Sequence, residues 1–494
     1  MANADVAGAA GRARVVTAGG AEAPLALAER LLARHHQGTV EHERGLALLR
    51  AIAGEEHAGE AQWMLGAYHL QAAVRTGAYA HAAHWLERAA GAGVPAAIDR
   101  LADLALAGLG VPRSPRRALE LRQRLADAGF PQAAWDVGYL SAQPEAASPQ
   151  HSAATAFARA CALGYPPAYY SLGLRFVAGL GVERDLVFGC ALLRRAADAG
   201  VPDAREAAAA LAPADARADG VERWYLALKA NLTAVFPLLD RLHQHALPAT
   251  GRVHPQVPRL EAHLASIGHP SLRINGAGRL GLMPSCTPVP DPPAPRLRWL
   301  AQAPRVAVID DFATREECSY LMFKWGAAMD ERRAAMRADG TRAWSSGSEF
   351  AVEPMQSDVV MRVLEGRLAA VTGAGAPGHV PDAWSVLRFE PGEQYRPLAE
   401  VPADQQLAQS RAPRSGPGGR RVATFLLYLR PPATGGEIVY PHAGIRLRGE
   451  RGMGVLHYDM TPDGRQDPAS VHGGLPVARG EKWLWRSILR GHPP

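Results

Sequence analysis

Lysine is rare in this sequence, which makes each lysine a candidate for a specific chemical task. Of the 54 lysine and arginine residues only three are lysines, namely Lys229, Lys324 and Lys482. A lysine ammonium is a compact positive charge that can bind a carboxylate. The strong preference for arginine most simply reflects coding composition, so the lysines that remain deserve separate inspection.

The cysteines exclude two other kinds of chemistry. There are four of them, too few and too widely spaced for a disulfide framework: Cys161, Cys190, Cys286 and Cys318. No Cys-x-x-Cys pair is present, so a zinc site built on thiolates is not expected. A chain of 494 residues can also bury a large core without such staples.

A Gly-x-Pro-x-Ala motif recurs in the first 210 residues. It begins at Gly93, Gly129, Gly164 and Gly200, with spacings of 36, 35 and 36 residues, and a weaker copy begins at His57. The glycine can end a helix in the left-handed conformation, and the proline after it blocks continuation of that helix. Each period therefore predicts a helix hairpin, and stacked hairpins form a solenoid.

These motifs resemble the Sel1-like repeats, which are related to tetratricopeptide repeats. The resemblance covers residues 25–210, after a flexible N-terminus at 1–24, and implies a surface that binds a protein or peptide partner. Aromatic residues of the repeats are expected in the core between hairpins rather than in a binding groove: Trp63, Tyr68, Trp85, Trp135 and Tyr170.

Two further segments connect the repeats to the C-terminal part. Residues 211–283 keep a partly helical pattern and are expected to cap the last apolar face of the solenoid. Residues 284–296 carry six prolines and should form an extended, semi-rigid linker. We therefore expect a domain boundary at this linker.

From residue 297 onward the sequence changes to short β-rich segments separated by Gly and Pro. Strands are expected over 306–309, 384–389, 422–429, 437–440, 454–458 and 482–489, with helices from 315 and over 360–371. This pattern predicts a sandwich or jelly roll with helices on one side, so the fold class is a multidomain α + β protein with an N-terminal α-solenoid.

Five segments of this part resemble the prolyl 4-hydroxylase type of Fe(II)- and 2-oxoglutarate-dependent dioxygenases. They are PRVAVIDDFATREEC (304–318), WSVLRFEPGEQYRP (384–397), GGRRVATFLLYL (418–429), TGGEIVYP (434–441) and DGRQDPASVHGGLPVARGEKW (463–483). The resemblance covers residues 297–494 and implies a double-stranded β-helix, a distorted jelly roll. It also implies Fe(II), 2-oxoglutarate and ascorbate as cofactors, and hydroxylation of a protein or peptide.

The resemblance assigns roles to individual residues. His472 matches the second metal-binding histidine, and Lys482 matches the residue that pairs with the distal carboxylate of 2-oxoglutarate. Thr424 matches a hydroxyl that often lies beside that carboxylate. Phe389 replaces a tyrosine found in many family members.

The first half of the metal motif departs from the family. A His-x-Asp sequence is expected there, but this chain has Leu398-Ala-Glu400, so the imidazole is lost while a carboxylate remains. Glu400 is the candidate carboxylate ligand. His442 or His457 are candidates for a displaced histidine ligand, and otherwise they are surface or packing residues.

Three functions therefore stay open at this point. The chain is an oxygenase that acts on a substrate presented by the repeats, a pseudoenzyme that binds 2-oxoglutarate or another anion without redox chemistry, or a scaffold. Retained His472 and Lys482 favour the first two, whereas Leu398 favours the last two.

Composition limits the partners. The net charge is +6 without a Lys/Arg cluster interleaved with aromatic residues, so nucleic-acid binding is not expected. No run of 18 apolar residues predicts a membrane span. The first residues lack a basic start followed by an apolar stretch, so we expect a cytoplasmic protein with reduced thiols.

Overall fold

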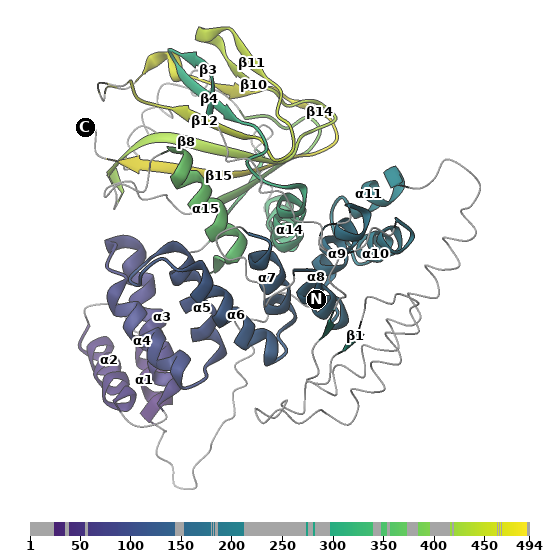
Figure 1. Ribbon diagram of the computed structural model, residues 1–494. Helices are drawn as coiled ribbons and strands as arrows, with labels where there is room; N and C mark the ends of the chain where they lie inside the picture. Colours follow the sequence, from purple (N-terminus) through teal and green to yellow (C-terminus); the bar gives the residue numbers. More distant parts are fainter. Residues whose placement is uncertain are drawn as a thin grey trace. The chain divides into compact units, whose positions relative to one another are not determined.

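A computed structural model gives the fold of this protein (Figure 1). It describes residues 24–34, 39–54, 58–143, 153–178, 180, 182, 186–211, 273–274, 280–281, 297–338, 347–352, 356–372, 384–395, 415–416, 419–461, 463, 465 and 467–491. The chain divides into two compact units, residues 1–125 and 126–494. The predicted repeat region therefore contributes helices to both units. Within the described residues no helix has the length and apolarity to cross a membrane.

The first unit is made of helix hairpins. Its helices are α1 (Pro24–Arg34), α2 (Val40–Ala53), α3 (Gly59–Thr76), α4 (Ala80–Gly91), α5 (Pro95–Ala107) and α6 (Pro115–Asp127). Gly93 has φ +86° in the turn between α4 and α5, and Pro95 occupies the first turn of α5, as the repeat motif predicts. Tyr68 and Trp85 are half-buried and pack against the apolar core of α1–α3.

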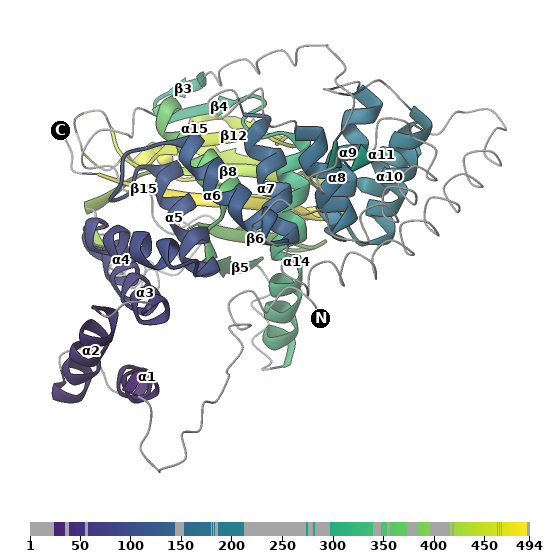
Figure 2. The same ribbon diagram turned by 60° about the horizontal axis from the view of Figure 1, so that its bottom comes forward.

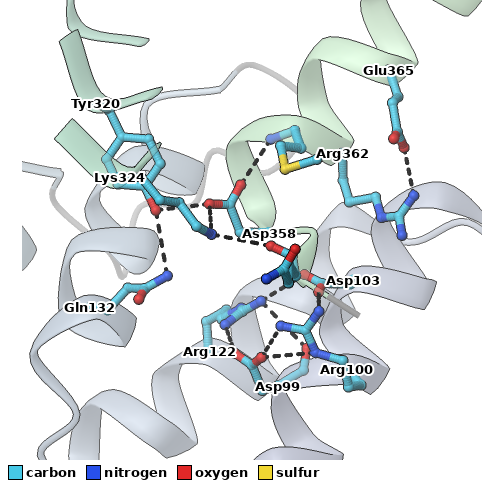
Figure 3. Close-up of polar contacts among 12 residues, drawn as sticks. Asp99, Arg100, Asp103, Arg122, Gln132, Tyr320, Lys324, Asp358, Arg362 and Glu365 are labelled. Atoms are coloured by element: carbon cyan, nitrogen blue, oxygen red, sulfur yellow. Dashed lines mark hydrogen bonds and ion pairs between the residues drawn. The ribbon is translucent and has the colours of Figure 1, made fainter. Parts of the chain in front are cut away.

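One buried ion-pair cluster stabilises α5 and α6 in the first unit. Arg122 is almost fully buried, and its guanidinium lies 2.7 Å from the carboxylate of Asp103 and pairs with Asp99. Arg100 lies 3.0 Å from the other oxygen of Asp103. Figure 3 shows these four side chains pointing toward one another. Buried arginines require such counter-charges, so we assign this cluster a structural role.

The second unit begins with the remaining repeats. Its first helices are α7 (Pro131–Ser141), α8 (Ala153–Ala162), α9 (Pro166–Ala178), α10 (Leu186–Asp198) and α11 (Ala204–Leu211). Gly129, Gly164 and Gly200 have φ values of +91°, +80° and +79° in the turns, which confirms their predicted role at helix ends. Trp135 and Tyr170 are buried as expected.

The segment predicted as a helical cap, 211–283, lies almost entirely outside the described residues. Its described part consists of α11's last residue and two short antiparallel strands, β1 (Arg273–Ile274) and β2 (Leu280–Gly281). The N-terminal segment 1–23 and the Pro-rich linker 284–296 also lie outside the described residues.

Two sheets form the C-terminal part of the second unit. The major sheet has the order β3-β4-β12-β8-β15-β6-β5, with β7 paired to β8. Its strands are β3 (Leu297–Gln302), β4 (Arg305–Ile309), β5 (Ser348–Ala351), β6 (Ser385–Phe389), β7 (Ser415–Gly416), β8 (Gly419–Arg430), β12 (Gly454–Tyr458) and β15 (Lys482–Gly491).

The minor sheet has the order β11-β10-β13. Its strands are β10 (Ile438–Tyr440), β11 (Ile445–Leu447) and β13 (Gly473–Gly474), and a short pair, β9 (Thr434–Gly435) with β14 (Val477–Arg479), accompanies it. All pairings are antiparallel among the described strands. Apolar side chains from both sheets form one buried core, which gives the predicted jelly roll.

Alternation along the strands gives the major sheet two different faces. On β8, Leu426 and Tyr428 belong to the core between the sheets. Phe425, which precedes Leu426 in the strand, contacts Phe312 and Trp384 on the other face. Helices α14 (Arg315–Ala338) and α15 (Val359–Thr372) lie on that second face (Figure 1). The period of two therefore separates a helix-covered face from the interior of the jelly roll.

Helix α14 begins with a capping box. The Thr314 hydroxyl accepts a hydrogen bond from the Glu317 amide at 3.1 Å, and the Thr314 amide donates to the Glu317 carboxylate at 2.8 Å. This reciprocal pair satisfies amides that the first turn of a helix leaves without partners. The sequence Thr-x-x-Glu thus explains why the helix starts where it does.

The repeats of the second unit pack directly against α14 (Figure 2). The Trp135 ring of α7 stacks on the Tyr320 ring of α14, with centroids 4.3 Å apart and an angle of 7°. The Tyr139 hydroxyl donates to the carboxylate of Glu317, which also binds Arg367 of α15. The last repeats and the jelly roll therefore form one packed body.

A second anchor joins the turn before α11 to the major sheet. Asp203 is buried, and its carboxylate lies 2.9 Å from the guanidinium of Arg430 and 2.8 Å from that of Arg451. The Ser319 hydroxyl donates to the carbonyl of Pro202 in the same turn. These contacts fix the end of the repeat region on the jelly roll.

Lys324 of α14 pairs with a buried carboxylate, that of Asp358, just before α15. Its ammonium pairs with the buried carboxylate of Asp358, which also accepts from the Tyr320 hydroxyl at 2.9 Å and from the Met361 amide at 3.0 Å (Figure 3). Burial opposes ionisation of Asp358, but the Lys324 ammonium outweighs it and lowers the pKa of that carboxyl. This lysine therefore balances the charge of Asp358, the carboxylate that caps α15.

Candidate functional site

A cavity of about 40 Å³ lies inside the jelly roll. Side chains from both sheets line it: Leu387, Phe389, Tyr395, Thr424, Leu426, Ile438, His457, His472, Gly473, Gly474, Lys482, Leu484 and Arg486. We call this space the barrel cavity. Three of the residues that the sequence singled out, His472, Lys482 and Thr424, are brought together here.

His472 enters the barrel cavity just after a short 3-10 helix, η4 (Pro468–Ser470). Asp467 caps that helix by accepting from the Ala469 amide at 2.9 Å. The His472 Nδ1 lies 3.0 Å from the Ser470 carbonyl oxygen. Because a carbonyl only accepts, Nδ1 carries the proton and Nε2 keeps the lone pair that a metal ion needs.

A second histidine lies beside the first. His457 is on β12, where it pairs with Thr424 of β8, and its side chain is 1% exposed. The rings of His457 and His472 have centroids 4.1 Å apart and an angle of 58°. Of the two displaced-ligand candidates, the structure places His457 next to His472. His442 lies exposed in η3 (Pro441–Ala443) and does not line the barrel cavity.

Two tyrosines flank the imidazoles. The Tyr395 ring is stacked near His472 at 6.1 Å, and the Tyr440 ring lies 5.4 Å from His472 and 6.1 Å from His457. Tyr440 is fully buried, and its hydroxyl has no hydrogen-bond partner among the described residues. Burial raises the pKa of this phenol, so it stays neutral and can donate.

Lys482 is one of two cationic side chains that line the barrel cavity; the other, Arg486, pairs with Glu349. The Lys482 side chain is 3% exposed, and its Nζ donates to the Gly436 carbonyl at 2.7 Å. The rings of Phe389 and Tyr428 lie 5.6 and 5.4 Å from the ammonium. In the described part of the chain no carboxylate forms an ion pair with Lys482. Burial lowers the pKa of this ammonium to about 8, while the Glu437 carboxylate opposes that shift.

The Thr-Gly-Gly-Glu sequence determines the position of the Gly436 carbonyl. Gly435 and Gly436 have φ values of +76° and +73°, a region that other residues enter at a cost of about 1 kcal/mol or more. A Cβ on Gly435 would also lie 2.4 Å from the Pro476 carbonyl oxygen. Both glycines are therefore required by the backbone path that brings this carbonyl to Lys482.

The other sequence-predicted site residues fall elsewhere. Glu400 and Leu398 lie outside the described residues, so Glu400 remains a prediction. Phe389 lines the barrel cavity as an apolar ring. Arg486 and Tyr440 were not singled out by sequence reasoning, although Arg486 lies on the same strand face as Lys482 and could have been found from the period of two.

Only two of the described side chains in the barrel cavity, His457 and His472, are of a type that commonly binds transition metals. The described residues contain no group of three His, Cys, Asp or Glu side chains placed to hold one ion. They do contain two adjacent imidazoles in one cavity, which are ligands that suit Fe(II). A third protein ligand would have to come from the part of the chain that the structure does not describe, where Glu400 lies.

Comparison with known proteins gives two independent matches. Residues 59–94, 95–130 and 166–201 match the Sel1 repeat family. Helices α7 and α8, between the second and third matched segments, form one more hairpin of the same kind. The resemblance inferred from the Gly-x-Pro-x-Ala period is therefore confirmed.

The second match concerns plant and viral proteins. The chain is 29% identical over 223 residues to probable prolyl 4-hydroxylase 10 of Arabidopsis thaliana, which covers 40% of this chain and 73% of that protein. It is 30% identical over 207 residues to prolyl 4-hydroxylase 1 of the same plant, covering 38% and 69%. The 2OG complex of the viral collagen prolyl hydroxylase from Paramecium bursaria Chlorella virus-1 matches 38% of this chain and 96% of that chain, with 21% identity and a TM-score of 0.28.

Proposed function

Because this chain belongs to the prolyl 4-hydroxylase family and carries Sel1 repeats, we propose that it is a 2-oxoglutarate-dependent dioxygenase that hydroxylates a protein or peptide. The barrel cavity is the proposed active site. The repeats are the proposed surface for the partner, since stacked helix hairpins form extended surfaces that bind other chains.

One observation carries the proposal, namely the buried ammonium of Lys482. Its hydrogen-bond acceptor is the neutral carbonyl of Gly436, so its positive charge is not balanced by a described carboxylate. Burying a charge in this way is costly unless an ion of opposite sign joins it. A dicarboxylate such as 2-oxoglutarate brings that charge, and one of its carboxylates would pair with Lys482.

Neighbouring residues suit the same ligand. Thr424 is 2% exposed and lines the barrel cavity, where its hydroxyl can donate to a carboxylate oxygen. Apolar side chains such as Leu387, Leu426 and Leu484 exclude water from the remaining wall. A dry wall strengthens the attraction between the ammonium and a carboxylate.

The metal would be held at the other end of the barrel cavity. His472 presents Nε2 because Nδ1 donates to Ser470, and Glu400 is the proposed carboxylate ligand. When bound, Fe(II) supplies the oxidising chemistry that couples oxygen and 2-oxoglutarate to hydroxylation of a C–H bond. The chain's own residues orient the imidazole, hold the dicarboxylate and limit access of water.

Lys482 makes binding of 2-oxoglutarate dependent on pH. Its pKa of about 8 means that the ammonium is charged at pH 7 and increasingly neutral above pH 8. Both carboxylates of the ligand stay ionised over this range, so only the lysine changes. We expect affinity to be constant between pH 6 and 7 and about tenfold weaker at pH 9.

Calorimetric titration of the full chain with 2-oxoglutarate at several pH values measures this dependence. The Lys482→Arg variant is the control, because a guanidinium stays charged throughout and any binding it keeps should not change with pH. A flat profile for the wild-type protein would contradict the role given to Lys482.

Anaerobic titration with Fe(II) in the presence of 2-oxoglutarate tests the proposed activity. A weak visible charge-transfer band and, after oxygen is admitted, succinate formation are expected for the full chain. Both should disappear in His472→Ala, which loses the imidazole ligand. If the wild-type chain shows neither but Leu398→His gains the band, the chain is instead a binding protein that has lost its metal centre.

A further inference from the structure

The two imidazoles in the barrel cavity are placed as a pair. The rings of His457 and His472 have centroids 4.1 Å apart, and they are inclined by 58° rather than stacked in parallel. Metal–nitrogen bonds of about 2.0–2.1 Å put the ring centres of two neighbouring imidazole ligands roughly 4.5–5 Å apart. The observed separation is a few tenths of an ångström shorter, so a small rotation of either ring would bring the pair to the spacing of two ligands of one ion.

Local structure fixes each ring from a different element. His457 is held by β12, which pairs with β4 on one side and β8 on the other. His472 is held by the turn after η4, where the Ser470 carbonyl binds Nδ1. A hydrogen bond of that kind orients a ligating histidine and strengthens it as a donor. The pair thus combines a side chain from a strand inside the major sheet with one from a hydrogen-bonded turn.

Tyr440 adds a third polar group next to the pair. Ile438 lines the barrel cavity, and Tyr440 follows it on the same face of β10 because side chains alternate along a strand. Its ring contacts both imidazoles, and its hydroxyl is buried without a hydrogen-bond partner among the described residues. A phenol left in this state has a donor to offer to a water or a ligand held beside the imidazoles.

We infer that His457 and His472 together bind one divalent metal ion, with His457 as a ligand that replaces the imidazole missing at Leu398. This inference rests on the proposed function for the identity of the metal, but the pairing itself rests on the ring geometry. His457 is a metal ligand in this reading, and Tyr440 is a positioning residue for a metal-bound water or for 2-oxoglutarate.

Titration of the metal-free full chain with Co(II) alone tests the pair. Co(II) bound by imidazoles gives visible absorption, so neither 2-oxoglutarate nor turnover is needed. We expect His457→Phe, which keeps a ring of similar size, to raise the Kd for Co(II) by at least about 100-fold. His472→Phe should do the same, and His442→Phe, at an exposed histidine, should leave the Kd unchanged.

Binding of 2-oxoglutarate to the metal-free variants separates this inference from the proposed function. His457→Phe should still bind 2-oxoglutarate through Lys482, which also shows that the variant folds. If His457→Phe binds Co(II) with wild-type affinity, or if the wild-type chain binds no Co(II), the inference that the two histidines bind one metal ion is wrong. If the wild-type chain does not bind 2-oxoglutarate, the proposed function is wrong instead.

A second measurement needs no variant. Pulsed electron paramagnetic resonance of Cu(II) bound to the wild-type chain counts the coordinated imidazoles through their remote nitrogens. A count of two coordinated imidazoles would support the inference that both histidines bind the ion, and a count of one would contradict it. This result does not depend on whether His457→Phe folds.

Discussion

Replacing Lys482 with methionine is expected to weaken binding of 2-oxoglutarate by at least about 30-fold. Methionine keeps most of the volume and apolar length of the lysine but removes the ammonium. The lost interaction is between a buried charge, 3% exposed, and a carboxylate in a largely apolar wall. Removing one partner of such a desolvated pair costs about 2–5 kcal/mol, and every 1.4 kcal/mol is a factor of ten in Kd.

The free variant should fold well. In the absence of ligand the ammonium is a buried charge beside a carbonyl and two aromatic rings, so an apolar replacement of similar volume is close to neutral or stabilising. Thermal unfolding of Lys482→Met should therefore start at the same temperature as the wild-type chain or slightly above it. Addition of 2-oxoglutarate should raise that temperature in the wild-type chain only.

Arg446→Met is the matched control for this experiment. Arg446 is a cation on the minor sheet, its side chain is 65% exposed, and it pairs with Glu437 at 3.4 Å. Its removal changes the net charge by the same amount without touching the barrel cavity. Calorimetry should give a wild-type Kd for Arg446→Met. If both variants bind 2-oxoglutarate equally weakly, the ligand is attracted by the overall positive charge of the protein and not by Lys482 in particular.

Local patterns predicted most of the secondary structure. The Gly-x-Pro-x-Ala period located the helix hairpins because a glycine with positive φ and a proline after it act within a few residues. The strands over 306–309, 384–389 and 454–458 were found because they alternate or are continuously apolar between turn residues. These features depend on neighbours in the chain, which a sequence displays directly.

The site was predicted only in part, because its geometry depends on strand register. Lys482 and His472 were recognised from their motif, whereas the pairing of His457 with His472 needed the register in which His457 lies opposite Thr424. A shift of one residue would turn the His457 side chain to the helix-covered face. No pattern within β12 fixes that register on its own.

The contacts between the repeats and the jelly roll could also not be predicted from the sequence. The prediction joined two parts by a linker, yet Trp135 stacks on Tyr320 across 185 residues of chain. Both are aromatic residues that any apolar core would accept, so their partners cannot be read from their type. These contacts hold the repeats over residues 131–203 against the part of the chain that contains the barrel cavity.

Glu317 takes part in the contact between the repeats and the helices on the jelly roll. Its carboxylate, 1% exposed, binds two nitrogens of Arg367 at 2.8 Å each and accepts from the Thr314 amide at 2.8 Å. It also accepts from the Tyr139 hydroxyl of α7. One carboxylate therefore connects the repeat helix α7 with both α14 and α15.

Substitution of Glu317 by glutamine is expected to lower the free energy of unfolding of the full chain by about 3 kcal/mol. The amide cannot neutralise Arg367, and breaking a buried pair by removing one partner costs about 3–5 kcal/mol. Urea denaturation at pH 7 measures the loss. Glu316→Gln is the control on the same turn, because Glu316 contacts Arg175 only at 3.4 Å, and it should cost less than about 1 kcal/mol.

The same variant distinguishes a local defect from loss of the anchor. If Glu317 joins the repeats to the jelly roll, Tyr139→Phe should cost about 1 kcal/mol in the wild-type background and almost nothing in Glu317→Gln, because the phenol has then already lost its charged acceptor. Additive losses would show that the two residues act separately. In that case the stacking of Trp135 on Tyr320, and not the carboxylate, would hold the repeats on the jelly roll.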